Sequence, residues 1–319
     1  MSKTFLVTGC AGFIGSNLVD YLLEKNYKII GLDNLSTGNK FFLKNALKHK
    51  NFKFHKIDLL RNNIEKYFKN IDRVYHLAAN ADVRFGLNHR KKDINQNIIV
   101  TYKVLEAIKK NQVQKIIFSS TGSVYGESNQ IPTKENTFFP IQTSLYGASK
   151  VSAEAIISAY SEAFNIKSYI FRFVSILGER YTHGHVFDFI KNLKKNNNML
   201  KVLGDGNQKK SYLHIKDCIE AIEIAIKKFD KKVNILNLGT QEYLNVKGSI
   251  KIICKHLKLK PKILYSGGRR GWIGDSPFIY LDTKKIRSTG WRPKYNIKES
   301  VKITAKYLID NQWLLKRKN

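Results

Sequence analysis

The sequence predicts an α/β fold built on a doubly wound parallel sheet. Short apolar runs alternate with longer segments whose apolar residues recur at helical spacing, and this β-α-β-α order is typical of a parallel sheet covered by helices. The chain has 319 residues, which is enough for one large α/β domain and a smaller C-terminal α/β lobe. A glycine-rich turn near the start and a Tyr-x-x-x-Lys pair near the middle indicate that this sheet supports a ligand-binding and catalytic site.

The first expected strand, Phe5-Leu6-Val7, leads through a glycine-rich turn into a helix that includes Ser16. Gly9, Gly12 and Gly15 have the G-x-x-G-x-x-G spacing, which lets the backbone turn tightly and approach a pyrophosphate closely. The N-terminus of the helix then presents free N–H groups to the phosphates. This arrangement predicts a Rossmann-type dinucleotide-binding site, although a glycine turn between a strand and a helix can also be purely structural.

The next expected strand, 28–32, ends at Asp33, about 20 residues beyond the glycines, where an acidic side chain accepts hydrogen bonds from a ribose diol. A carboxylate there repels a 2′-phosphate, and the following Asn34-Leu35-Ser36-Thr37-Gly38 contains no arginine to hold one. The cofactor is therefore expected to be NAD rather than NADP. A third strand, 52–57, ends at Asp58-Leu59, which could flank an adenine, although Asp58 could simply cap a turn.

Two further apolar runs, 73–79 and 115–120, are expected strands, and the segment 97–110 between them is expected to be helical. Ligands of open parallel sheets bind beyond the carboxyl ends of the strands. The small Ala78-Ala79 pair at one such end would let a cofactor lie close. The hydroxyl groups of Ser120-Thr121 at the next could reach a bound sugar.

Tyr146 and Lys150 are four residues apart near the start of an expected helix over 146–164, so both side chains share one face. A free tyrosine has a pKa near ~10, and a neighbouring ammonium group favours the phenolate and lowers that pKa. The same ammonium group can hold ribose hydroxyls. A Y-x-x-x-K spacing also occurs on exposed helix faces; its position after a dinucleotide turn and a Ser-Ser-Thr strand end favours a catalytic pair.

The formal net charge of +31 raises nucleic acid or an anionic membrane as possible partners. The lysines are nevertheless spread along the chain, and Lys/Arg runs stay short, as at Lys109-Lys110 and Arg90-Lys91-Lys92. This distribution favours a solvated basic surface and argues against nucleic acid and membrane partners. A basic cleft would still help to attract a doubly charged nucleotide substrate.

Other features predict a soluble, unprocessed, cytoplasmic protein without a metal. Apolar stretches are too short to span a bilayer, and the first expected strand follows the N-terminus almost at once. The three cysteines, Cys10, Cys218 and Cys254, form no metal-ligand pattern and suit a reducing compartment. Cys10 is interpreted as a small buried residue rather than a reactive thiol. The Thr182-His183-Gly184-His185 stretch lacks cysteine or carboxylate partners at metal-binding spacing.

These motifs together resemble the extended short-chain dehydrogenase/reductases of the nucleotide-sugar epimerase and dehydratase family, over essentially the whole chain. The resemblance implies tightly held NAD, an NAD-binding Rossmann domain over 1–170 and a mainly nucleotide-sugar-binding lobe over 171–319, with the chain crossing between the lobes. It also implies a homodimer joined through two helices of each subunit. The matching segments are Thr8 to Gly15, Asp33 to Gly38, Asp58-Leu59, His76-Leu77-Ala78-Ala79, Phe118-Ser119-Ser120-Thr121 and Tyr146 to Lys150, with weaker matches at Arg172, Gly204-Asp205-Gly206, Asp217 and Gly290-Trp291.

The resemblance also implies roles for particular residues. Those expected to act in catalysis are Tyr146, Lys150 and Thr121. Those expected to contact the cofactor are Gly9, Gly12, Phe13, Ile14, Gly15, Asp33, Asn34, Ser36, Thr37, Gly38, Asp58, Leu59, Leu77, Ala78, Ala79, Asn97, Ser119, Tyr146 and Lys150. Those expected to contact the substrate are Thr121, Ser123, Tyr146, Ser175, Lys210 and Arg270.

One segment helps to distinguish the dehydratases, decarboxylases and 4-epimerases of this family. Dehydratases of this family carry an acidic residue directly after the threonine of the strand end, whereas this chain has Thr121-Gly122-Ser123. Ser123 also replaces a glutamate of the decarboxylases. A 4-epimerase needs only a base, a hydroxyl group and a bound NAD that takes a hydride and returns it. The expected reaction is therefore 4-epimerisation, most simply of UDP-glucose/galactose or their N-acetyl forms, in which Tyr146 removes the C4 hydroxyl proton while Thr121 hydrogen-bonds the same oxygen.

Departures from the family pattern leave the substrate open. Ser175 replaces an asparagine that reaches the diphosphate, and Lys210 replaces an arginine with a point charge. The stretch after Arg270 looks longer than in common UDP-galactose epimerases. Two alternatives remain: an epimerase, dehydratase or decarboxylase of the same family that acts on another nucleotide sugar, and a non-catalytic NAD- or polyanion-binding protein. The intact catalytic set argues against the second.

Overall fold

The computed structural model describes residues 2–83, 89–137 and 141–316. The chain divides into two compact units, between which it passes several times. The first unit comprises Met1–Val124, Leu145–Arg172 and Ile222–Leu236, and the second comprises Tyr125–Ser144, Phe173–Ala221 and Asn237–Asn319. The expected assignment of 1–170 to the cofactor and 171–319 to the substrate stays a prediction.

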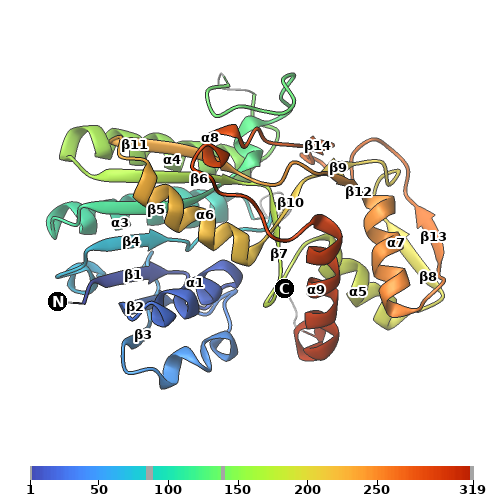
Figure 1. Cartoon of the computed structure of the whole chain (residues 1–319), viewed down its shortest axis with the longest axis horizontal. Coiled ribbons are helices and arrows are strands. Elements are labelled where there is room, and N and C mark those ends of the chain that lie inside the picture. Colours follow the sequence, from blue (N-terminus) through green and yellow to red (C-terminus); the bar gives the residue numbers. More distant parts are fainter. Residues whose placement is uncertain (1, 84–88, 138–140, 317–319) are drawn as a thin grey trace. The chain divides into compact units, whose positions relative to one another are not determined.

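A seven-stranded sheet forms the centre of the first unit, in the order β11-β6-β5-β4-β1-β2-β3 (Figure 1). The strands β1 to β5 pair in parallel. The order reverses at β1, so ligands are expected beyond the carboxyl ends of β1 and its neighbours. The expected doubly wound α/β sheet is confirmed. Its strands are β1 (Thr4–Thr8), β2 (Lys28–Asp33), β3 (Phe52–Lys56), β4 (Arg73–His76), β5 (Lys115–Thr121), β6 (Lys167–Phe173) and β11 (Val233–Leu238).

Helices and short turns complete the first unit. Helix α1 packs on β1 and β2, whereas α3 and α4 pack on β4, β5 and each other. Burial on both faces explains why the strands have nearly continuous apolar runs instead of alternating ones. The elements are α1 (Phe13–Glu24), η1 (Lys40–Leu43), η2 (Ala46–Lys48), η3 (Glu65–Phe68), α2 (Arg90–Asp93), η5 (Ile94–Ile99), α3 (Val100–Lys110), η6 (Gly122–Tyr125) and α4 (Leu145–Phe164), with α6 (Ile215–Lys228) shared between the units.

The helix expected over 97–110 differs from the structure at its start. The segment begins as α2, continues as the π-helical η5 and becomes an ordinary α-helix only at Val100. Thr101 Oγ1 donates to the carbonyl oxygen of Asn97 at 2.6 Å, so a buried side chain takes part in the backbone pattern there. Apolar periodicity does not report such a change, and short π-helical segments often accompany functional sites.

The second unit contains three small sheets and four helices of its own, described here for residues 125–137, 141–144, 173–221 and 237–316. Helix α9 packs against α5 and α7. A capping box begins α9: Asn296 accepts from the Glu299 amide at 2.8 Å, and Glu299 accepts from the Asn296 amide at 3.0 Å. The elements are β7 (Ser175–Leu177) with β10 (Tyr212–His214); β8 (Met199–Val202) with β13 (Lys262–Tyr265); β12 (Leu244–Asn245), β9 (Lys209–Lys210) and β14 (Phe278–Ile279); α5 (His185–Lys195), α7 (Val246–Leu257), α8 (Lys284–Arg287), α9 (Ile297–Asp310) and η7 (Gln312–Lys316).

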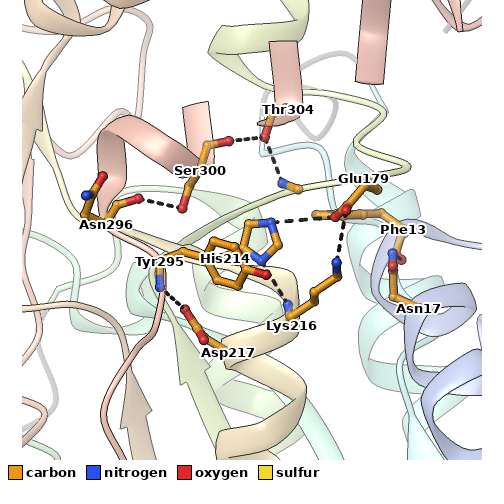
Figure 2. A network of polar contacts seen from close by, with 11 residues as sticks. Phe13, Asn17, Glu179, His214, Lys216, Asp217, Tyr295, Asn296, Ser300 and Thr304 are labelled. Atoms are coloured by element: carbon orange, nitrogen blue, oxygen red, sulfur yellow. Dashed lines mark hydrogen bonds and ion pairs between the residues drawn. The ribbon is translucent and has the colours of Figure 1, made fainter. Parts of the chain in front are cut away.

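A buried histidine lies at the centre of a polar network in the second unit. Figure 2 shows His214 beside Glu179, with Nε2 3.6 Å from Oε2 of the carboxylate. Lys216 pairs with the other carboxylate oxygen at 3.3 Å. Nearby, the amide of Gly178 donates to Thr304 Oγ1 on α9 at 2.8 Å. Burial lowers the pKa of His214 to about 4, so this histidine is neutral at physiological pH.

Candidate active site

The glycine turn between β1 and α1 is tightly packed. Gly9 has a φ of +69°, and a Cβ there would lie 2.7 Å from the amide nitrogen of Ala78. A Cβ on Gly15 would lie 2.1 Å from the carbonyl oxygen of Gly9. Helix α1 begins after Gly12 without a side-chain cap, and the N-terminus of a helix favours an anion. These features fit the pyrophosphate of a dinucleotide.

Asp33 ends β2 beside this turn and is held by two backbone amides. Its Oδ2 accepts from Ala11 at 2.9 Å, and its Oδ1 accepts from Leu35 at 2.7 Å. Burial raises the pKa of this carboxyl group more than the two hydrogen bonds lower it. A Cβ on Gly38 would lie 2.8 Å from Oδ1, so the absence of a side chain there leaves the carboxylate uncrowded. Each oxygen retains accepting capacity for a ribose diol.

The polar residues that follow β2 and β3 form local turns. Asn34 Oδ1 accepts from the Ser36 amide at 3.0 Å. Asp58 Oδ1 accepts from the Leu60 amide at 2.9 Å, so Asp58 takes the turn-capping role that the sequence left open. The side chain of Leu59 is buried in the core of the first unit. The expected contacts of these residues and of Thr37 with a cofactor stay predictions.

Thr8 and His76 connect the glycine turn to the end of β4, a link that the sequence analysis missed. Thr8 Oγ1 accepts from the amides of Leu77 and Ala78, each at 3.2 Å. A hydrogen bond of 2.8 Å joins the same oxygen to His76 Nδ1, and one of 3.0 Å joins His76 Nε2 to Thr101. Burial, assisted by the charge of Lys150, lowers the pKa of His76 to about 3. A neutral histidine therefore positions the chain around Ala78.

The three residues expected to act in catalysis come together at the end of β5 and the start of α4. Tyr146 is buried and hydrogen-bonded to Thr121. The Thr121 hydroxyl group also donates to Ser123 Oγ at 3.2 Å. Lys150 Nζ donates to the carbonyl oxygen of Ser119 at 2.8 Å. The site therefore combines a phenol, an alcohol and an amine in a setting largely shielded from solvent.

The pKa values at this site depart from the sequence expectation. Burial raises the pKa of Tyr146 to about 12, and the carboxylate of Asp93 acts in the same direction. Burial also lowers the pKa of Lys150 to about 7, although Glu154 and Asp93 favour the ammonium form. The expected decrease in the Tyr146 pKa is therefore wrong for this environment, because desolvation of a phenolate outweighs the hydrogen bond with Thr121.

Ser120 does not present its hydroxyl group to a sugar, as the sequence analysis allowed. The hydroxyl donates to a carboxylate oxygen of Glu154, and Arg172 Nη2 lies 2.6 Å from the other oxygen. Glu154 is one helical turn beyond Lys150 on α4.

Asn97 directs its side chain into the protein. Its Nδ2 donates to Ser149 Oγ at 2.8 Å, and its Oδ1 accepts from the amide of Asn80 at 2.9 Å. The expected contact of Asn97 with a cofactor stays a prediction, as do those of Phe13 and Ile14 at the start of α1. The observed contacts show Asn97 joining the loop after β4 to α4.

The residues expected to contact substrate in the second unit are held differently from one another. Lys210 Nζ lies 2.7 Å from Asp275 Oδ1, and the two side chains are only 17% and 2% exposed. The same Nζ lies 5.0 Å from the ring centre of Trp272, which belongs to the longer stretch noted in the sequence. Arg270 is 46% exposed and pairs with Glu127. Ser175 begins β7, opposite Tyr212 of β10.

The two histidines of the 182–185 stretch have separate partners. His183 Nδ1 is hydrogen-bonded to Thr182 at 3.1 Å, and His185 Nε2 to Ser249 at 2.7 Å. Within residues 2–83, 89–137 and 141–316, no group of three metal-ligating side chains is suitably placed for an ion. Over the same residues, every helix is too short or too polar to cross a bilayer.

Comparison with known proteins agrees with this arrangement. The model of the NAD dependent epimerase/dehydratase family matches residues 5–239. A protein of Methanocaldococcus jannaschii described as a putative UDP-glucose 4-epimerase is 36% identical over 313 residues, which cover 96% of this chain and 98% of that protein.

Two solved structures are similar over nearly the whole chain. A UDP-galactose 4-epimerase has a TM-score of 0.87 and 33% identity, with 97% of this chain and 100% of that chain covered. The UDP-glucuronic acid 4-epimerase from Bacillus cereus, solved with UDP-glucuronic acid and NAD, has a TM-score of 0.88 and 27% identity, with 97% and 99% covered.

Proposed function

The chain belongs to the NAD-dependent epimerase/dehydratase family, and from this premise we propose that it is a nucleotide-sugar 4-epimerase that acts on a UDP-hexose. The enzyme uses NAD as its cofactor. The observation that carries the proposal is the set formed by the buried Tyr146 and Lys150 and the partly buried Thr121. The relatives described above carry the names of three UDP-sugar 4-epimerases, which supports the choice of reaction and nucleotide.

The first unit has the features needed to hold NAD. The crowded turn at Gly9 and Gly15 and the N-terminus of α1 would receive the pyrophosphate, and Asp33 would receive a ribose diol. Lys150 would hold the hydroxyls of the second ribose. When bound, NAD supplies an acceptor for a hydride and returns it.

In the proposed reaction, Tyr146 would take the proton of the C4 hydroxyl group, and a bound NAD would supply the acceptor for the hydride of C4, which would leave a 4-keto sugar. Thr121 donates a hydrogen bond to the same oxygen. After the sugar had turned over, its opposite face would take the hydride back, and Tyr146 would return the proton. Atoms and electrons balance within the cycle, because both the proton and the hydride are given back.

Positive charge near Tyr146 is necessary for this role, because a pKa of about 12 leaves the phenol protonated at neutral pH. Lys150, with a pKa of about 7, carries part of that charge and can change it as the proton moves. Burial raises the pKa of Tyr146 and lowers the pKa of Lys150. A bound ligand or a transferred proton can therefore change the ionisation of either group.

The Thr121-Gly122-Ser123 stretch favours epimerisation over elimination. Ser123 donates its amide to Thr121 Oγ1 at 3.1 Å and accepts from the same hydroxyl group. No carboxylate belongs to this stretch, whereas removal of water or carbon dioxide in related enzymes uses one there. The geometry supports a site that exchanges a proton and a hydride with one carbon.

In the second unit, Lys210, Arg270 and Ser175 are proposed to hold the diphosphate of the nucleotide sugar. Lys210 is a compact charge fixed by Asp275, and Arg270 is accessible on the surface. A lysine cannot make the bidentate contact of the usual arginine. We therefore expect weaker discrimination of phosphate geometry than an arginine would give.

We also propose a homodimer in the cytoplasm. Three side chains along η5, α3 and α4 of the first unit leave apolar surface exposed, namely Ile99 at 40%, Tyr102 at 46% and Phe164 at 43%. Exposed apolar residues gathered on neighbouring helices suit a contact between subunits. The three free cysteines suit a reducing compartment. Light scattering on Tyr102→Glu should show monomers where the unaltered chain gives dimers; identical masses would refute this interface.

The test of the proposed reaction is incubation of the purified protein, without added NAD, with UDP-, GDP-, CDP- and dTDP-hexoses, followed by proton NMR and mass measurement. Inversion at C4 of a UDP-hexose with unchanged mass is expected. Loss of water or carbon dioxide would instead assign the enzyme to the dehydratases or decarboxylases of the family. Conversion of a GDP-, CDP- or dTDP-sugar alone would overturn the choice of nucleotide.

A further inference from the structure

Asp93 is a buried carboxylate for which the reaction above has no use. It ends α2 directly before the π-helical η5 and is only 1% exposed. Within the part of the chain that the structure describes, its Oδ2 is buried without a hydrogen-bond partner. Burial of a carboxylate oxygen without a partner lowers the stability of the fold, so the presence of Asp93 at this position calls for an explanation.

The other carboxylate oxygen of Asp93 begins a path of hydrogen bonds that leads to the catalytic helix. Oδ1 accepts from Asn80 Nδ2 at 2.7 Å and from Asn97 Nδ2 at 3.5 Å. Asn97 Nδ2 also donates to Ser149 Oγ at 2.8 Å, and Ser149 Oγ donates to the carbonyl oxygen of Tyr146 at 2.8 Å. Asp93 is therefore connected to the first turn of α4, which carries Tyr146 and Lys150.

The charged groups around Asp93 come from several elements. Helix α4 contributes Lys150 and Tyr146, α2 contributes Lys92, and the loop after β4 contributes Asp82, whereas Glu154 on α4 acts on Lys150. His76 on β4 also interacts with Lys150 but is neutral.

The charged side chains of α3 face elsewhere. Lys103 donates to the carbonyl oxygen of Leu60 at 2.7 Å, and Glu106 accepts from Tyr160 at 2.6 Å. Of the two cations that act on Asp93, Lys92 on the same helix has the larger effect, and Lys150 is the one that belongs to the catalytic pair.

We propose that Asp93 is a positioning residue of the active site: its buried negative charge balances the ammonium group of Lys150, and the path through Asn97 and Ser149 fixes the turn that carries Tyr146. The proposal rests on the proposed function insofar as Tyr146 is the base. The π-helical turn of η5 accompanies this arrangement, since it lies between Asp93 and α3 and contains Asn97.

The direction of the electrostatic effect follows from the charges. A carboxylate favours the ammonium form of Lys150 and disfavours the phenolate of Tyr146, so it raises the pKa of both groups. Removal of the charge should lower both pKa values. If Tyr146 must be ionised and Lys150 protonated for turnover, both limbs of the pH profile of kcat/KM should move to lower pH in Asp93→Asn.

The test compares Asp93→Asn with the unaltered holoenzyme. The near-ultraviolet absorbance of the phenolate is followed in alkaline titration, and the signal of Tyr146 is obtained by subtracting the titration of Tyr146→Phe. We expect the midpoint to fall by about one pH unit, the lower end of the effect of a nearby charge. This readout needs no turnover, so it stays informative even if the proposed epimerase activity fails. Where turnover is measured, both limbs should shift together.

Two variants serve as controls. Asp82→Asn removes the same charge from a residue beside Asp93 that is no main source of the Tyr146 or Lys150 shifts, and should leave the titration in place. Asp93→Glu keeps the charge and should restore the midpoint toward that of the unaltered enzyme. If Asp93→Asn does not fold, Asn80→Ala tests the same coupling, because loss of the 2.7 Å hydrogen bond makes Asp93 easier to protonate and should lower the midpoint by less.

A reduced activity with an unmoved Tyr146 midpoint and unmoved pH limbs would overturn the proposal, because it would leave Asp93 a purely structural residue. An equal shift of the Tyr146 midpoint in Asp82→Asn would also overturn the proposal, since the effect would then not be specific to the carboxylate of Asp93.

Discussion

The two units hold their ionisable groups in different ways. At the end of β5, Lys150 is held by the neutral carbonyl oxygen of Ser119 at 2.8 Å, and Tyr146 is held by the hydroxyl group of Thr121. In the second unit, Lys210 is held by the carboxylate of Asp275 at 2.7 Å. A neutral partner lets a buried group gain or lose its proton, whereas an opposite charge keeps it ionised. Lys150 can therefore change its protonation state more readily than Lys210, which its carboxylate partner keeps charged.

Removal of the Tyr146 hydroxyl group from the first unit should have the largest effect of the changes predicted for the two units. Tyr146→Phe should lower kcat about 100- to 10,000-fold, the usual contribution of a positioned acid–base group, while NAD remains bound. NMR of the nucleotide sugar and the NAD content of the denatured protein measure the two quantities. Tyr160→Phe on the same helix, which loses only a 2.6 Å bond to Glu106, is the matched control. A similar loss of activity in both variants would contradict the assigned base.

A side chain at Gly15 should break the cofactor turn. In Gly15→Ala the new Cβ would lie 2.1 Å from the carbonyl oxygen of Gly9, so α1 must move. We expect a loss of about 1–3 kcal/mol in the free energy of unfolding and loss of co-purifying NAD. Gly12→Ala, whose Cβ would lie 3.2 Å from the same oxygen, should cost less stability. Equal stability of both variants in urea titrations would show that the turn is less crowded than described.

Removal of one partner of the buried ion pair in the second unit should destabilise the protein. Lys210→Met leaves Asp275, which is 2% exposed, without its counter-charge, and should cost about 3 kcal/mol of unfolding free energy. Lys210→Met with Asp275→Asn should recover most of that loss. Urea unfolding of the single and double variants measures the coupling, and additive losses would mean that the pair contributes little.

Acidification should weaken both units through their buried histidines. The pKa of His76 is about 3 and that of His214 about 4, both below the ordinary ~6.5. The unfolded chain therefore takes up protons first as pH falls, so this stability is fully present above about pH 6.5 and is lost toward about pH 3 to 4.

Between pH 6.5 and 5.5, above the range of most carboxyl groups, each histidine should cost about 1 kcal/mol of unfolding free energy. Burial also lowers the pKa of His185 to about 3, so urea titrations at the two pH values measure the sum of three contributions, and His214→Asn should remove roughly a third of it. An unfolding free energy that does not change over this interval would contradict neutral burial.

The exposed ion pair of the second unit should matter least for stability. Arg270 and Glu127 are 46% and 33% exposed, and solvent screens such pairs. Arg270→Ala should change the free energy of unfolding by less than about 1 kcal/mol, in contrast to Lys210→Met. Thermal unfolding of the two variants side by side measures the difference; a larger loss in Arg270→Ala would reverse the ranking of the two pairs.

Most of the first unit could be predicted from the sequence, because its signals are short. The glycine spacing, the acidic residue at the end of β2 and the Tyr146-Lys150 pair each span a few residues. The structure confirms the doubly wound sheet, and within the first unit it places Thr121 next to Tyr146. The start of η5 was missed, because the π-helical turn depends on buried side-chain contacts that leave no trace in apolar periodicity.

The part of the second unit that we propose to bind substrate was much less predictable. Lys210 could be named but not recognised as the partner of Asp275, which lies 65 residues away in sequence. Arg270 and Lys210 looked alike as charges, and only packing distinguishes the exposed residue from the buried one.

The sequence by itself determined the class of sheet, the family and the identity of the groups at the end of β5, because spacing along a regular strand or helix dictates which side chains share a face. Tertiary structure decided how those groups ionise. Burial raises the pKa of Tyr146 and lowers that of Lys150, and Asp93 acts on both from a distant segment of the chain. Desolvation and long-range charge depend on what packs around a residue, and no local pattern contains that information.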